Sequence, residues 1–295
     1  MLSRGDAALG AAAAFGSSIT WAYGSARYAL ASRTVSPLRV NLMRMLISTP
    51  PFFVAALCTS GLFTGITQKN FTWLLVSTLC SFAVADNLFF AAAKRLGVSS
   101  ALAIASSYPL WAALKGTVFD GEPFGLTRAA GTLCCVGGVS AIIKLGDQQA
   151  KLEGKRDSVG VLLALITSLL WGGNTIAIKA GSVGLSLSTV AVTRNFIALC
   201  VLGTLVLLGR APGPTSPDGG WRSMVPAVVV DCLIGSVFFM YGLSHTDLAV
   251  GATLSSLAPL LSLPIALKMG VEKLSPPKLA AVATTVLGIV LLASS

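Results

Sequence analysis

Charged residues are scarce in this chain. Only 11% of its 295 residues are Asp, Glu, Lys or Arg, against about 25% in a typical soluble domain, while 54% are hydrophobic. This composition does not suit a domain with a water-facing surface, and it predicts membrane spans. The net charge of +10 does not indicate a nucleic-acid partner, because the basic residues fall singly or in small groups between apolar runs.

Residue types that hold metals and cofactors are also few. His245 is the one histidine, and the six cysteines form no C-x-x-C pair, so neither a zinc site nor a disulfide framework is expected. The sequence contains no P-loop, no G-x-G-x-x-G and no H-E-x-x-H motif. We therefore expect no cofactor, and these absences disfavour an ATP-driven pump and a membrane metalloprotease.

Apolar runs long enough to cross a membrane fill most of the chain. A spanning helix needs about 20 mostly apolar residues, and spans are expected to be helical because lipid cannot satisfy an open backbone edge. The expected spans are 7–29, 37–59, 71–93, 99–118, 124–145, 158–181, 187–209, 222–243, 249–269 and 276–293. The longest polar linker, 148–157, separates a first five-helix unit at 1–147 from a second at 158–295.

The two units repeat each other at a fixed offset of 150 residues. Without gaps, Arg44 aligns with Arg194 and Trp21 with Trp171. Five crossings per unit is an odd number, so the second unit starts on the opposite side of the membrane. We therefore expect an all-α integral membrane protein of ten transmembrane helices in two inverted five-helix repeats. The other matched pairs are Gly10 and Gly160, Pro109 and Pro259, Glu122 and Glu272, and Gly138 and Gly288.

Three stretches resemble the EamA-like family of the drug/metabolite transporter superfamily. "LLWGGNTIAIKAG" (169–181) resembles the family's LWG-x-N-x-x-x-x-K signature. The arginine that the family has in its second helix matches Arg44 and Arg194. "GEPFGLTRAAGTLCCVGGV" (121–139) and its repeat from Val271 resemble the fifth-helix pattern. The resemblance implies a ten-helix carrier of small metabolites, with a cavity lined by helices one to four and six to nine. It also implies that helices five and ten pack the halves together.

Polar side chains inside the spans are the candidates for function. Arg44 and Arg194 are expected either to snorkel to the interface or hydrogen-bond carbonyls at a helix end, or to bind a carboxylate or phosphate in a cavity. Asp86 and Asp231 align with serines, so they are not symmetry partners, and they either couple transport to protons or form static ion pairs with the arginines. The candidate substrate-binding residues are Arg44, Asn87, Tyr108, Trp171, Asn174, Arg194 and Tyr241, and no catalytic or metal-binding residue is predicted.

Two prolines are predicted to bend the helices that carry them. Pro109 and Pro259 lie within the fourth and ninth expected spans. Proline removes a backbone donor and frees a carbonyl, and broken helices often line transporter sites.

These features predict a secondary transporter of a small polar metabolite, amino-acid-like or another organic anion or zwitterion, that works by alternating access. The protein is not expected to be an enzyme. The alternative is a non-transport membrane protein, either an intramembrane enzyme or lipid-handling protein, or an assembly scaffold. An acyl-transfer enzyme would need a Ser–His pair through His245, which lies at a span end next to Thr246 and Asp247, and the sequence places no nucleophile for it.

The side of the membrane that holds the termini is predicted differently by two signals. Five basic residues lie on the side of the N-terminus and fourteen on the other, and the two intramembrane arginines complete the total of 21. The charge bias places the termini outside the cytoplasm, whereas the family resemblance implies cytoplasmic termini. A plasma or inner membrane is expected rather than an organellar one. The expected partners are a small-molecule substrate and the lipid bilayer, with no nucleic acid, and the protein is expected to be a monomer or homodimer.

Overall fold

The computed structural model describes residues 4–59, 61–111, 114, 125–152, 157–246, 248–268 and 275–293. Within these ranges every regular element is a helix and no strand occurs. The first unit contains α1 (Arg4–Ala31), α2 (Pro37–Thr59), α3 (Gln68–Thr78), the π-helical segment η1 (Leu79–Ala83), α4 (Ala85–Leu96), α5 (Val98–Ala105) and α7 (Leu126–Leu152).

The second unit follows the same order of elements. It contains α8 (Ser158–Gly181), α9 (Leu187–Leu207), the 3-10 turn η2 (Trp221–Met224), α10 (Val225–Val228), the π-helical segment η3 (Val229–Gly235), α11 (Ser236–His245), α12 (Leu248–Ser255), α13 (Ala258–Lys268) and α14 (Pro276–Ala293). Local signals start several of these helices. Asp157, for example, caps α8 by accepting a hydrogen bond from the Gly160 amide at 2.9 Å.

Five helical stretches among the described residues are long and apolar enough to cross a membrane. They are Pro37–Thr59, Gln68–Leu96, Ser158–Gly181, Leu187–Leu207 and Trp221–His245. Three shorter apolar helices accompany them, at Ala129–Ile142, Val250–Ser262 and Pro276–Leu291. The chain is therefore an integral, multi-pass membrane protein, as its composition predicts.

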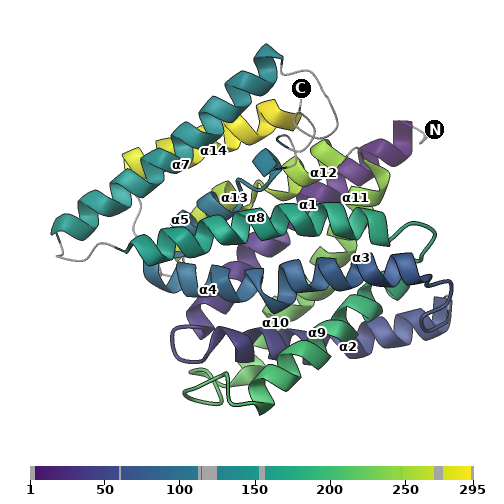
Figure 1. Ribbon diagram of the computed structural model, residues 1–295. Helices are drawn as coiled ribbons and strands as arrows, with labels where there is room; N and C mark the ends of the chain where they lie inside the picture. The colour runs from purple at the N-terminus through teal and green to yellow at the C-terminus, as the bar shows by residue number, and fades with distance from the viewer. Residues whose placement is uncertain are drawn as a thin grey trace.

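The first helix of each unit packs against the opposite unit. Helix α1 lies against α11, α12, α13 and η3, whereas α8 lies against α3, α4 and α5. Helices α2 and α9, which are repeat mates, pack on each other. The last helices, α7 and α14, form the most extensive interhelical contact and run side by side along one edge of the bundle (Figure 1). The two units are thus interlocked rather than merely adjacent.

Glycine contacts reveal a two-fold relationship between the units. A side chain at Gly10 would collide with His245, and one at Gly160 would collide with Arg95 and Leu96. At the 150-residue offset, Gly10 aligns with Gly160 and His245 aligns with Arg95, so the two contacts are equivalent with the units exchanged. A two-fold axis between the repeats requires this exchange. Glycine at both positions lets the crossing helices approach closely. The same exchange relates the contact of Gly138 with Thr285 to that of Gly288 with Cys135.

The helices are interrupted at equivalent positions in the two units. The segments η1 and η3 begin at Leu79 and Val229, which are 150 residues apart, and each widens the helix that carries it. In the fourth expected span α5 ends at Ala105 and a turn precedes Pro109, while in the ninth α12 ends at Ser255 and α13 begins just before Pro259. The predicted proline bends are confirmed, as breaks rather than gentle kinks.

Candidate functional site

A polar cavity of about 140 Å³ lies between the two units. Its lining comes from α1, α2, η1, α4 and the turn after α5 in the first unit, and from α8, α9, η3, α11 and α12 in the second. These elements correspond to helices one to four and six to nine, the set that the family resemblance implies. No described side chain of the last helices, α7 and α14, lines it. Both helix interruptions and both proline breaks contribute lining residues, so the irregular backbone lies where it faces the cavity.

Arg44, on α2, forms ion pairs with two aspartates. Its Nη1 donates to Asp86 Oδ2 at 2.7 Å, and its Nη2 lies 3.4 Å from Asp231 Oδ2. Nη1 also donates to Asn41 Oδ1 at 2.6 Å, and the guanidinium carbon lies 4.5 Å from the ring centre of Tyr28. Only 3% of Arg44 is exposed, so these ion pairs are shielded from water. Removing one partner would leave the opposite charge buried and uncompensated.

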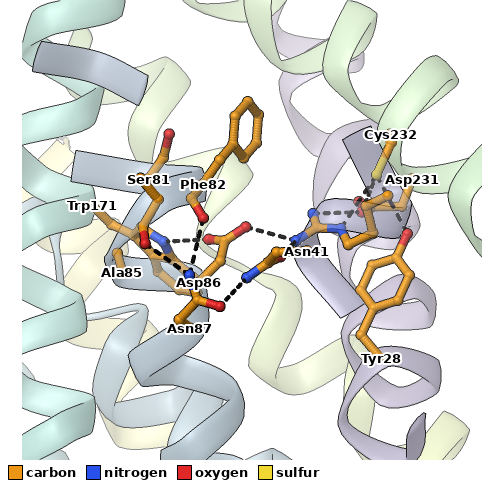
Figure 2. A network of polar contacts seen from close by, with 12 residues as sticks. Tyr28, Asn41, Ser81, Phe82, Ala85, Asp86, Asn87, Trp171, Asp231 and Cys232 are labelled. Carbon is orange, nitrogen blue, oxygen red and sulfur yellow. Dashed lines mark hydrogen bonds and ion pairs between the residues drawn. The ribbon is translucent and has the colours of Figure 1, made fainter. Parts of the chain in front are cut away.

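Asp86, on α4, connects the two units. Its Oδ2 accepts from Arg44, and its Oδ1 accepts from the indole Nε1 of Trp171 on α8 at 3.1 Å. Figure 2 shows Asp86 held between Trp171 on one side and the side chains around Asn41 on the other. Asp231 approaches the same arginine from η3 of the second unit. The polar network therefore crosses the interface between the units twice.

Arg194, the repeat mate of Arg44, has a different environment. Its Nη2 donates to Ser81 Oγ at 2.9 Å and to Asn174 Oδ1 at 3.1 Å, and its guanidinium lies 4.6 Å from the ring centre of Phe82. Its Nε is buried without a hydrogen-bond partner. In the part of the chain that the structure describes, no carboxylate forms an ion pair with it. The two arginines are thus equivalent in sequence but not in charge compensation.

Aromatic rings form the apolar wall of the cavity. Trp171 contacts Trp21 edge-on with ring centres 5.7 Å apart, and it contacts Tyr108 at 6.3 Å. The Tyr108 hydroxyl donates to the backbone carbonyl of Ala252 at 2.8 Å, which fixes the ring between the units. Aromatic walls around buried charges give a chamber suited to a small solute with an apolar body and a polar end.

A family comparison now agrees with this geometry. The model of the EamA-like transporter family matches residues 8–144 and again residues 158–294. The chain belongs to the EamA-like transporter family. The two matches have the same offset of 150 residues as the repeat found in the sequence, so each unit is one EamA-like repeat.

Two further similarities accompany the EamA-like match. An uncharacterized transporter from Archaeoglobus fulgidus is 27% identical over 186 residues, which cover 62% of this chain and 63% of that protein. The chain therefore matches somewhat less than two thirds of that relative's length. A solved crystal structure superposes with a TM-score of 0.67 at 20% identity, covering 98% of this chain and 96% of the other, and this likeness concerns the fold alone.

Seven of the nine site residues predicted from the sequence line the cavity. They are Arg44, Asp86, Tyr108, Trp171, Asn174, Arg194 and Asp231. The structure places Asn87 and Tyr241 outside this lining. The Asn87 amide donates to the Ala83 carbonyl at 2.8 Å and its oxygen accepts from Asn41 at 2.9 Å, so it stabilises the end of η1. Tyr241 stacks on His245, with ring centres 3.9 Å apart.

Several lining residues of this EamA-like cavity were not predicted as site residues. Small hydroxyl side chains are the main group: Ser17, Ser81, Ser106, Thr175, Ser236 and Ser255. Serine and threonine are common throughout the spans, so composition gives no signal for them. Ser81 and Ser236 did carry one signal, since they align with Asp231 and Asp86. Among the described residues no three His, Cys, Asp or Glu side chains cluster as a metal site.

Proposed function

We propose that the protein is a secondary transporter that moves a small polar metabolite, an organic anion or zwitterion, by alternating access. The observation that carries this proposal is the cavity that both EamA-like repeats line with equivalent helices. A two-fold relation between repeats supplies two conformations of similar energy, each open to one side of the membrane. The uncharacterized transporter named above supports transport as the activity.

The meeting of helix ends supports ten crossings and inverted repeats. At one end of the bundle, Thr59 and Ser188 form a hydrogen bond of 2.9 Å, which joins the end of α2 to the start of α9. At the other end, Arg95 forms a partly exposed ion pair with Asp157 at 3.1 Å, which joins the end of α4 to the start of α8. Alternating crossings place these helix ends together in this way. The proposed topology puts equivalent loops of the two repeats on opposite sides of the membrane.

Proton coupling is proposed for the acids around Arg44. Asp86 and Asp231 line the cavity and share one arginine. Protonation of either acid would weaken its hold on Arg44 and change the charge of the cavity. A cavity that faces each side in turn would then load and release the proton together with the solute.

Counterflow in proteoliposomes tests the transport proposal. Vesicles are preloaded with an unlabelled amino acid or small carboxylate, and uptake of the same labelled solute is measured. At least one solute is expected to exchange, and Arg194→Gln is expected to abolish this exchange because the variant loses the cavity arginine that forms no ion pair with a described carboxylate. Tyr241→Phe, a change outside the cavity lining, serves as the control and is expected to retain exchange. Absence of exchange for every solute, together with hydrolysis or capture of a partner protein, would favour the non-transport alternative.

A further inference from the structure

The cavity contains two equivalent half-sites that differ in one chemical respect. Each is built around one of the repeat-related arginines, Arg44 and Arg194. The 150-residue offset places Asp231 where the other half-site has Ser81, and Asp86 where it has Ser236. The first half-site therefore supplies two carboxylates, and the second supplies two hydroxyl groups in their place.

The protein itself supplies the counter-ions of Arg44 in the first half-site. Asp86 and Asp231 bind its guanidinium at 2.7 and 3.4 Å, and Trp171 supports Asp86 from the opposite repeat. Two acids against one arginine leave this group of side chains with a surplus of one negative charge when all three are ionised. No further anion is needed there.

The half-site of Arg194 is incomplete. Only 4% of Arg194 is exposed, its hydrogen-bond partners Ser81 and Asn174 are neutral, and its Nε has no partner. Asp86 acts on Arg194 only through its charge, since its oxygens accept from Arg44 and Trp171. The desolvation of this buried cation is therefore only partly repaid. The guanidinium lines the cavity, as do Ser81 and Ser236. A carboxylate entering the cavity would meet the planar donor fork of Arg194 and the hydroxyl of Ser236, whereas the Ser81 hydroxyl already donates to the Ser77 carbonyl at 2.8 Å.

We propose that the carboxylate of the transported solute binds Arg194 in the place that an aspartate occupies at Arg44. The bound carboxylate would then face Arg194 as the Asp86 carboxylate faces Arg44 within the protein. This inference rests on the proposed transport function and names the anionic subsite within the cavity. The surplus negative charge around Arg44 then lies across the cavity from the bound carboxylate, which favours solutes with a positive or neutral opposite end.

The size of the cavity limits which solutes can be used to probe the anionic subsite. A cavity of about 150 Å³ holds benzene in other proteins, and this one measures about 140 Å³. Acetate, alanine and benzoate span the fitting range, and each has a primary amide of nearly the same shape: acetamide, alaninamide and benzamide. Each pair differs mainly in the anionic group, so a difference within a pair reports recognition of the carboxylate.

Thermal denaturation of the purified full-length protein measures this binding at constant ionic strength. At least one of the three carboxylates is expected to raise the melting temperature of the wild type, and its amide is expected to bind roughly ten- to a hundredfold more weakly. Ser236→Asp places an internal carboxylate in the position equivalent to Asp86, and it is expected to abolish the shift. Ser236→Asn has the same side-chain size without the charge, and it is expected to weaken binding far less than Ser236→Asp.

Three outcomes would overturn the proposal. The first is stabilisation by a carboxylate and its amide alike, or by no carboxylate. The second is retention of the carboxylate shift in Ser236→Asp. The third is failure of both Ser236→Asp and Ser81→Asp to fold, because the new carboxylate should pair with Arg194 and not destabilise the protein. This assay measures binding alone, so carboxylate binding without counterflow would contradict the transport function and leave the subsite intact.

Discussion

Arg44→Gln is expected to lower the free energy of unfolding by about 3–5 kcal/mol, the usual cost of removing one partner from a buried ion pair. The substitution leaves the carboxylates of Asp86 and Asp231 inside the membrane protein without their cation. It also removes the contact of the guanidinium with the Tyr28 ring. Denaturation of the purified protein, followed by circular dichroism, measures the loss.

The repeat mate provides a matched control for this prediction. Arg194→Gln removes the equivalent side chain but breaks no ion pair among the described residues; it loses the contact with the Phe82 ring and hydrogen bonds to Ser81 and Asn174, each bond contributing about 0.5–1.5 kcal/mol. The triple variant that adds Asp86→Asn and Asp231→Asn to Arg44→Gln is expected to recover much of the lost stability, because no buried charge remains unpaired. Equal destabilisation by the two arginine variants would contradict the assigned division between the half-sites.

Asp86→Asn is expected to abolish accumulation of the solute driven by a pH gradient while leaving counterflow in place. Asparagine keeps the shape of the side chain and an oxygen that can accept from Trp171, but it cannot bind and release a proton at neutral pH. Arg44 retains Asp231 as its counter-ion, so the cavity is expected to stay assembled. Uptake into proteoliposomes with and without an imposed pH gradient separates the two activities.

An aspartate outside the cavity controls for the loss of a charge alone. Asp157 forms an ion pair with Arg95 at the surface, and Asp157→Asn is expected to leave both accumulation and counterflow close to the wild-type values. Accumulation by Asp86→Asn at the wild-type level would remove Asp86 from the coupling mechanism. Loss of counterflow in the same variant would indicate that Asp86 binds the solute or holds the cavity together.

The sequence predicts most of the architecture because the residues that match between the two units include rare types. Arginine and tryptophan are uncommon in this chain, so their agreement at one offset identifies the two units and the two arginines of the cavity. Glycine gives the same information about packing, since Gly10 and Gly160 lie at points where helices approach closely. Periodic apolar runs supply the helices themselves.

The division between the half-sites could not be predicted from the sequence. Arg44 and Arg194 appear equivalent there, and nothing local indicates that Asp86 and Asp231 both approach the same one. That arrangement arises because α2 packs on α4 of its own repeat and on η3 of the opposite repeat, a long-range property of the fold. The segments η1 and η3 were also missed, because their π-helical turns contain no proline or other local signal that apolar periodicity detects.

Accessibility of single cysteines to a membrane-impermeant thiol reagent tests the central claim, one cavity between inverted repeats, most directly. With the six native cysteines replaced, cysteine is placed at Ser17 in the cavity, or at Thr64 or Ser216 in equivalent exposed loops of the two repeats. Vesicles of both orientations are then labelled. The account predicts that Thr64→Cys and Ser216→Cys react from opposite sides, and that Ser17→Cys reacts from both. Labelling of the two loops from one side, or of Ser17→Cys from a single side only, would contradict it.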